Sequence, residues 1–433
     1  MKHILLTLLS ILPAVFSAGQ EPWSLEQCIR YGLEHNIGLR QQTLEADIRQ
    51  AEYRQAQAAH LPVVSAGIAR DYNWGRSVDM QELVIIRNKL TQATGASLQA
   101  SLTLFNGLAL HNARLAAGKA ADAAREDSRQ VREDLTVEIT RAYLDLMLAG
   151  QIETYARESY AAIVQLQERT VGFVEAGSHP KSALDEMAAQ VASEKAAVVD
   201  AWCRVRTASL ALTRLMQLPD STELHISDSF GQEPAADLVP TVTDSQVEDY
   251  LFADPRIRST QAQHEQMRYR QNQSLAAFFP TLRLTAGYGT YFSSTGEGSF
   301  RTQIDDNRNP SLSLQLDIPI FQSLQAVTQL RKSRIEREMA RLEVEKTRSR
   351  IVDEIRSAVI EAENCRQQYR LSEETREAMR QLLEITEARY NHGAATALDY
   401  ITARNNHFKA VSDCLQAKWQ YLFQLKILER YQR

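Results

Sequence analysis

The clearest pattern along the chain is an alternation of apolar and polar residues in four short segments. In 311–318 every second residue is leucine or isoleucine, and the residues between them are polar. The same period of two runs through three other segments, although Arg70 interrupts the apolar set of the first. A period of two places the two sets on opposite faces of a strand. The sequence therefore predicts strands at about 62–75, 95–105, 280–292 and 309–319.

Two environments produce this alternation, namely a half-buried sheet in a soluble protein and a barrel in a membrane. The segment length suits a tilted strand that crosses a bilayer. Aromatic residues gather at the strand ends, where membrane interfaces favour them: Tyr72, Trp74, Tyr288, Tyr291 and Phe292. Open strand edges are not tolerated in lipid, and single-chain barrels begin at about eight strands. A membrane barrel would therefore need further copies of this chain.

The N-terminus predicts export. Lys2 and His3 precede an apolar run over 4–16, and the small residues Ser17-Ala-Gly19 follow it. This order is typical of a secretory signal, which we place at 1–18. An exported chain with such strands is expected to meet outer membrane lipid.

Very long helices are the second feature. No proline lies between Gly107 and Glu175, and 322–391 contains neither proline nor glycine. A helix of about 70 residues is roughly 105 Å long, and helices of this length normally pair as coiled coils. Gly177 and Gly393 suit the left-handed position that ends a helix. We predict that returning helices at about 182–217 and 395–430 complete two antiparallel hairpins.

The chain repeats itself. Tyr53-Arg-Gln-Ala-Gln57 recurs as Tyr269-Arg-Gln-Asn-Gln273, about 216 residues later, and other matches keep this offset. We therefore predict a mainly α-helical fold of two repeats, each a strand pair followed by a long helical hairpin. The repeats cover 19–218, with its hairpin at 107–217, and 245–433, with its hairpin at 321–430. An irregular linker, 219–244, joins them.

Composition excludes several classes of function. The formal net charge is −5, which gives no basic excess for nucleic acid. The four cysteines are far apart in sequence, so neither a zinc ribbon nor a disulfide framework is expected. Catalytic and nucleotide-binding motifs are lacking, and we predict no enzyme activity, no cofactor and no metal site. His179 and His392 lie at the two tips and are interpreted as exposed polar residues.

The order of these elements and several short segments resemble the TolC family of outer membrane factors. The resemblance covers nearly the whole mature chain and rests on these segments: His60-Leu-Pro62, Phe279-Pro280, Leu104-Phe-Asn-Gly107, and Tyr390-Asn-His-Gly393 followed by Leu398-Asp399. It implies a homotrimer whose twelve-stranded outer membrane barrel continues into an α-helical barrel in the periplasm. It also implies a passive duct of a tripartite efflux or type I secretion system, which meets a periplasmic adaptor and an inner membrane transporter.

The resemblance also implies a periplasmic gate. Asp399 matches an aspartate that rings the constricted mouth, and Tyr390 and Asp185 match a pair that links neighbouring hairpins in the closed state. The tips at Gly177 and Gly393 are the expected adaptor contacts. The chain departs from the family pattern at Thr402 and Ala395, where an acidic residue and an arginine are common. A further departure is Ile320-Phe-Gln-Ser323, which lacks the glycine expected after the second strand pair.

Alternative readings remain for the whole chain and for single residues. A periplasmic coiled-coil adaptor or scaffold without a barrel would explain the helices but not the four alternating segments. Asp399 could simply stabilise the first turn of its helix, where a carboxylate is favourable. Tyr390 could only pack a coil seam. The pattern does not choose between a drug, a metal and a protein as the exported substrate.

Overall fold

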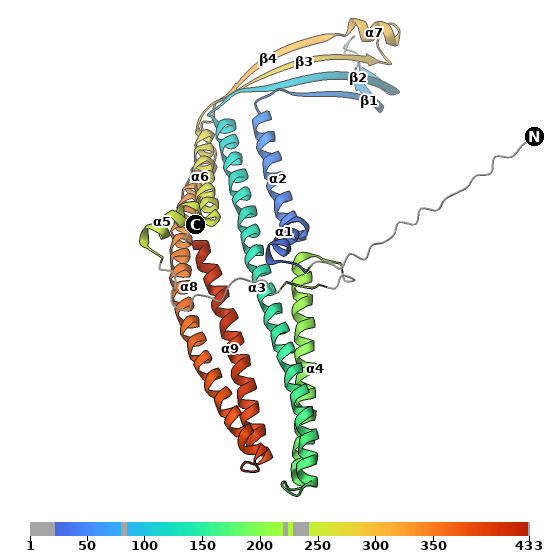
Figure 1. Ribbon diagram of the computed structural model, residues 1–433. Helices are drawn as coiled ribbons and strands as arrows, with labels where there is room; N and C mark the ends of the chain where they lie inside the picture. The colour runs from blue at the N-terminus through green and yellow to red at the C-terminus, as the bar shows by residue number, and fades with distance from the viewer. Residues whose placement is uncertain (1–21, 79–84, 220–223, 228–241, 432–433) are drawn as a thin grey trace, which may run out of the picture. The chain divides into compact units, whose positions relative to one another are not determined.

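The computed structural model describes residues 22–78, 85–219, 224–227 and 242–431 (Figure 1). The signal expected at 1–18 lies outside the described residues. The helices are α1 (Leu25–His35), α2 (Ile37–Ala58), α3 (Ala109–Glu175), α4 (Ser182–Met216), α5 (Asp244–Ala253), α6 (Pro255–Leu275), the 3-10 turn η1 (Ala276–Phe278), α7 (Phe300–Asp306), α8 (Gln325–Asn391) and α9 (Ala397–Tyr431). The strands are β1 (Val63–Val78), β2 (Ile85–Asn106), β3 (Thr281–Ser293) and β4 (Asn309–Asp317).

The chain divides into two compact units, and each unit takes segments from both repeats. The hairpin unit contains the described residues of 1–40, 131–250 and 352–433. The strand unit contains the described residues of 41–130 and 251–351. The long helices α3 and α8 contribute residues to both units. Segments from both repeats therefore pack together within each unit, and neither repeat forms a compact unit of its own.

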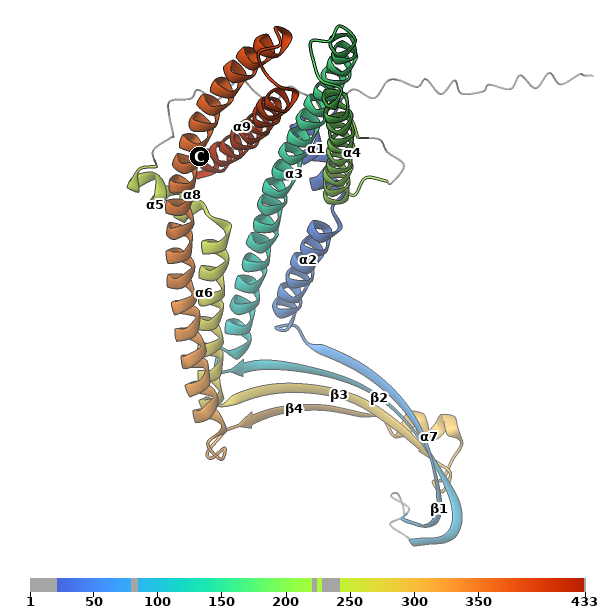
Figure 2. The ribbon, with the colours of Figure 1, turned by 90° about the horizontal axis from the view of Figure 1, so that it is seen from below.

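The strand unit carries one antiparallel sheet in the order β1-β2-β3-β4, which Figure 2 shows as a curved ribbon. Directly paired residues share a face, because side chains alternate along each strand. One such row across the sheet is Ala66, Leu98, Tyr288 and Pro310. Apolar side chains on this face are 45–83% exposed in the chain: Val64, Ile68, Leu98, Tyr288, Leu312, Leu314 and Leu316. The sheet therefore presents one continuous apolar face.

The first hairpin of the sheet is longer than predicted, and the prediction of a loop over 76–92 was wrong for 76–78 and 85–92, while 79–84 lie outside the described residues. Pairing continues through Asn73 with Thr91 and Trp74 with Leu90 up to Val78 with Ile85. The polar stretch Arg87-Asn-Lys89 has no apolar alternation, so the pattern could not reveal it. Backbone pairing between adjacent strands fixes this segment despite its composition. In the second pair, α7 occupies a segment that was predicted as loop, and the Ser299 hydroxyl caps it by accepting from the Thr302 amide at 3.3 Å.

The turns that lead from the sheet into the long helices show how the two repeats differ. Gly107 has a φ of +61°, and a Cβ there would lie 2.7 Å from the Phe279 Cβ and 2.9 Å from the Ala276 oxygen. The second repeat has no glycine after β4. Its turn places Ser323 at a φ of +46° where the first repeat has Gly107, whereas Leu324 and its counterpart Leu108 both have a φ of +66°. Positive φ is costly for residues with a side chain, so this departure from the family pattern is met by local backbone strain.

The hairpin unit is held by an apolar core and by a few polar contacts. Cys28, Ile139, Leu212 and Met216 are fully buried in the core, where α1 packs on α3 and α4. The Tyr143 hydroxyl donates to the Ser227 oxygen at 2.9 Å and so fastens the segment after the first hairpin to α3. None of the helices in the described part of the chain is long and apolar enough to cross a membrane.

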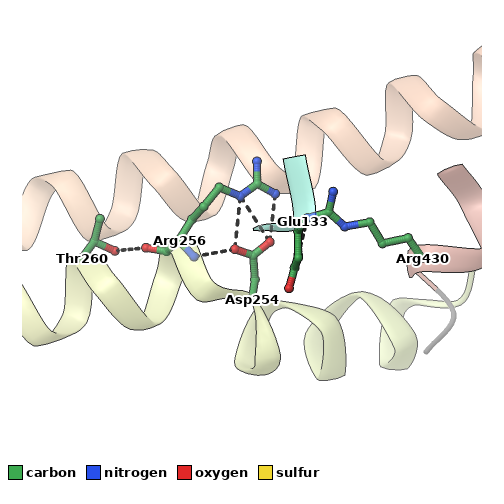
Figure 3. A network of polar contacts seen from close by, with 5 residues as sticks. All are labelled: Glu133, Asp254, Arg256, Thr260 and Arg430. Carbon is green, nitrogen blue, oxygen red and sulfur yellow. Dashed lines mark hydrogen bonds and ion pairs between the residues drawn. The ribbon is translucent and has the colours of Figure 1, made fainter. Parts of the chain in front are cut away.

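Figure 3 shows one polar contact from each unit. In the hairpin unit, Arg430 of α9 pairs with Glu133 of α3 at 2.5 Å. In the strand unit, Asp254 is buried at the start of α6. Its Oδ1 accepts from the Arg256 amide at 2.7 Å, and its Oδ2 pairs with the Arg256 guanidinium at 2.8 Å. The carboxylate thereby satisfies an orphan amide at the helix N-terminus.

Candidate functional site at the hairpin tips

Both long helices end in the same hydrogen-bonded turn. At the first tip Gly177 has a φ of +76°, its amide donates to the Val174 oxygen, and the Ser178 amide donates to the Phe173 oxygen. At the second tip Gly393 has a φ of +70°, with equivalent bonds from its own amide and from that of Ala394. This is the Schellman pattern, which favours glycine because an L side chain is strained there. The sequence correctly placed both turns.

Tyr390, one of the three expected gate residues, is fully buried near the end of α8. Its hydroxyl lies 2.9 Å from the Thr170 hydroxyl, which in turn donates to the Leu166 oxygen at 2.8 Å. The Tyr390 hydroxyl is therefore the donor to Thr170. Its ring contacts His179 at 4.9 Å and Tyr400 at 5.6 Å between centroids. Tyr390 thus packs the second hairpin against the first within one chain.

Asp399, the expected ring residue, is exposed in the first turn of α9 and forms a reciprocal cap with Thr396. Its Oδ2 accepts from the Thr396 amide at 3.0 Å and from the Thr396 hydroxyl at 2.7 Å. The Thr396 hydroxyl accepts from the Asp399 amide at 3.1 Å. These bonds to Thr396 lower the pKa of Asp399 below its ordinary value, with a smaller contribution from Arg389. The carboxylate is thus held in its charged form.

Asp185, the third expected gate residue, has a different environment. It is exposed in the first turn of α4, and within the described ranges it forms no hydrogen bond or ion pair. Lys181 precedes α4 and makes no side-chain cap, so the first hairpin lacks the cap that Thr396 and Asp399 give the second. The hydroxyl of Tyr390 forms its hydrogen bond with Thr170 of the same chain, and not with Asp185. The link between Tyr390 and Asp185 therefore stays a prediction.

A polar seam joins α3 to α9 farther from the tips, and sequence reasoning missed it. The Arg404 guanidinium donates to the Ser159 oxygen at 2.6 Å, and the Trp419 indole donates to Gln151 at 3.0 Å. Between them the Tyr155 hydroxyl lies 3.0 Å from Nδ1 of His407. The residues look like solvated positions in sequence, because their pairing depends on the rotation of two helices about their axes.

Burial and neighbouring cations set the chemistry of this seam. Burial lowers the pKa of His407, and Arg404, Arg376 and Arg380 lower it further, while Glu384 opposes them. Burial raises the pKa of Tyr155. At neutral pH the seam therefore holds a neutral imidazole next to a neutral phenol.

The helices α4 and α8 expose apolar residues that the described helices leave uncovered. On α4 the exposed residues are Val199, Trp202 and Leu210. On α8 they are Ile360, Leu371, Leu382 and Ile385. Exposed apolar stripes of this kind mark surfaces that contact another macromolecule.

No three histidine, cysteine, aspartate or glutamate side chains in the described part of the chain lie close enough to hold a metal ion. All four cysteines are free thiols. Burial raises the pKa of Cys28 to about 12, so this thiol stays protonated and behaves as a small apolar group.

Comparison with known proteins gives a consistent result. The family model described as outer membrane efflux protein matches residues 29–216 and 247–431. Outer membrane protein OprJ of Pseudomonas aeruginosa is 24% identical in an alignment 415 residues long, which covers 89% of this chain and 78% of OprJ. Outer membrane efflux protein BepC of Brucella suis is 23% identical over 71% of this chain. Alkaline protease secretion protein AprF of Pseudomonas aeruginosa is 24% identical over 69%. These alignments span only 65% of BepC and 61% of AprF.

Experimental structures share the fold. The structure of CusC, described as a transmembrane channel, aligns with a TM-score of 0.81 at 19% identity, covering 94% of this chain and 91% of CusC. The Campylobacter jejuni CmeC outer membrane channel aligns with a TM-score of 0.81 at 17% identity, covering 94% and 85%. The open state of the Neisseria gonorrhoeae MtrE outer membrane channel aligns with a TM-score of 0.75 at 20% identity, covering 94% and 88%.

Proposed function

The chain belongs to the outer membrane efflux protein family, and from this premise we propose that it forms a passive export duct. The protein lies in the outer membrane, and its helical part extends into the periplasm. The observation that carries the proposal is the continuous apolar face of the sheet, which is exposed in the single chain. A periplasmic scaffold would have no reason to expose this face to water, whereas a strand in lipid requires it.

The duct is proposed to be a homotrimer. In the described sheet β1 pairs only with β2, and β4 pairs only with β3, so both outer edges are open. Lipid does not satisfy such edges, and other copies of the chain can pair with them. Three copies of a four-stranded sheet give the twelve-stranded barrel that the resemblance implies. The exposed stripes on α4 and α8 support the same closure between helices of adjacent copies.

A periplasmic adaptor and an inner membrane transporter are the proposed partners. The adaptor would contact the tips around Gly177 and Gly393, whose turns are exposed. The relatives include one protein named for efflux and one named for protease secretion. A duct in either kind of system supplies a passage, and the energy for export would come from the inner membrane partner.

Asp399 is the proposed gate residue. Three exposed copies near the duct axis would form an anionic ring that favours cations. Each carboxylate is exposed in the first turn of α9, and its lowered pKa leaves it charged at neutral pH. Tyr390 and Asp185 are proposed to take part in the closed state through contacts at the tips.

Single-channel recording of the protein in planar bilayers tests this assignment. Asp399→Asn keeps an acceptor for the Thr396 amide but removes the charge, so it should lower the preference for cations. Thr396→Val is the matched control, because it removes the hydroxyl of the cap and leaves the charge. Its selectivity should stay at the wild-type value. Unchanged current and selectivity in Asp399→Asn would refute the gate while leaving the fold intact.

A further inference from the structure

Arg70 is a cation on the apolar face of the sheet. It lies on β1 between Ile68 and Tyr72, and alternation along the strand places all three on the same face. Ile68 is 83% exposed and Tyr72 is 44% exposed, and the Arg70 side chain is also exposed. A charged side chain near the middle of a membrane is costly, so its height on this face decides whether it can be tolerated.

The strand register places Arg70 at the edge of the apolar band. Below it the row through Ala66 contains Leu98 and Tyr288, and the row through Ile68 contains Ala96 and Thr290. The row through Arg70 contains Thr94 and Phe292, and the next residue of β1 on this face is Tyr72, with Trp74 beyond it. Aromatic residues of this kind concentrate at membrane interfaces. Arg70 therefore lies at headgroup level, near the strand ends that point away from the helices.

The guanidinium is oriented but has no counter-ion. Its Nη2 donates to Oε1 of Gln92 at 3.0 Å, and its central carbon lies 5.3 Å from the centre of the Tyr72 ring. The backbone of Gln92 is itself held by Ser294, whose hydroxyl accepts from the backbone N–H of Gln92 at 2.8 Å. Within the described ranges Arg70 forms no ion pair. Arg308 on the neighbouring loop, by contrast, pairs with Asp305.

We propose that Arg70, with Gln92 and Tyr72, binds the headgroup phosphate of an anionic lipid in the outer leaflet. A guanidinium presents paired N–H donors that match two phosphate oxygens. Gln92 occupies one donor and leaves the others free, and the Tyr72 ring supports the cation from one face. The inference rests on the proposed function, because it requires this face of the sheet to contact lipid.

Trp74 provides a local reporter for bound lipid. Its indole is 76% exposed and its centroid lies 6.3 Å from that of Tyr72. The other tryptophans, Trp23, Trp202 and Trp419, belong to the hairpin unit. The protein is reconstituted in phosphatidylcholine bilayers, and brominated phosphatidylcholine or brominated phosphatidic acid is then titrated in to quench Trp74. A Trp74→Phe variant gives the background from the other three tryptophans.

The expected result is at least threefold stronger relative binding of the brominated anionic lipid in the wild type. The ratio should fall to about one in Arg70→Gln and should be partly retained in Arg70→Lys. Arg283→Gln, on the opposite face of β3, is the matched control and should keep the wild-type ratio. Inorganic phosphate at millimolar concentration should not displace the brominated lipid, because the acyl chains contribute to binding.

The outcomes separate this inference from the proposed function. Equal quenching by both lipids, or a preference that survives in Arg70→Gln, would overturn the lipid site while confirming that the strand faces lipid. Displacement by inorganic phosphate alone would overturn the assignment to a lipid. Absence of quenching by either lipid would overturn the membrane placement of the sheet itself, and the lipid site with it.

Discussion

At the scale of single residues, the three expected gate residues differ in exposure and in hydrogen bonding. Asp399 forms three hydrogen bonds with Thr396 in its own turn and is exposed. Tyr390 is buried in a seam within the chain, and Asp185 is exposed and forms no hydrogen bond or ion pair in the described ranges. Asp399 was singled out by the resemblance at Tyr390-Asn-His-Gly393 followed by Leu398-Asp399, and its position in the first turn of a helix was the alternative interpretation. The sequence could not identify Thr170, since that contact depends on how two distant helices face each other.

The bond between Tyr390 and Thr170 gives the first prediction. Both side chains are fully buried, so Tyr390→Phe should leave the Thr170 hydroxyl with one partner fewer. We expect a loss of about 1 kcal/mol in the free energy of local opening at the tips. Hydrogen exchange of tip amides measures it. In a double-mutant cycle, the loss of opening free energy in the double variant with Thr170→Val should be smaller than the sum of the two single losses. Fully additive losses would show that the bond contributes nothing.

The seam at His407 predicts a response to pH. Its pKa is lowered in the folded protein, so it contributes stability that is fully present above its ordinary pKa of 6.5. That stability should be lost progressively as the pH falls below this value. Amides of α3 near Tyr155 should therefore exchange faster at pH 5 than at pH 7.5, after correction for intrinsic rates.

Two variants check that His407 causes this response. His407→Gln retains polar contacts without titrating in this range, so the pH dependence near Tyr155 should disappear. His392→Gln removes an exposed histidine at the tip and should retain it. A pH dependence that persists in His407→Gln would assign the effect to another group.

At the scale of elements, prediction from sequence succeeded where one local signal decides the structure. The long helices follow from the lack of proline, and their ends follow from Gly177 and Gly393, whose φ values only glycine adopts readily. The extension of β1 over 76–78, the earlier start of β2 at Ile85 and the helix α7 were missed. Residues near the outer ends of strands need no apolar alternation, so pairing across the hairpin decides their structure.

Two glycines near the end of α3 should respond oppositely to substitution by alanine. Gly177→Ala should destabilise the first tip by about 1 kcal/mol, because alanine is strained at a positive φ. Gly172→Ala lies within α3, where a Cβ would meet no atom within 4 Å, and it should stabilise the helix by about 0.5–1 kcal/mol. Protease cleavage rates at the tip report both changes. Equal effects of the two substitutions would contradict the assigned backbone conformation.

At the scale of the whole molecule, the repeats and the compact units divide the chain differently. Each unit combines corresponding segments of both repeats, because helices and strands from the two halves pair with each other. The repeat was visible in the sequence through a constant offset, whereas this side-by-side packing was not. Among the described residues, the outer edges of the sheet are unpaired, and the helices α4 and α8 expose apolar stripes.

The central claim is that several copies of the chain close these edges in the outer membrane. The most direct test is the protein mass of the particle solubilised from outer membranes in detergent, determined by light scattering with the detergent contribution subtracted. We predict a stable particle with three times the mass of one mature chain. A monomer, or a dimer absent from the membrane fraction, would contradict the duct and would favour a soluble scaffold in its place.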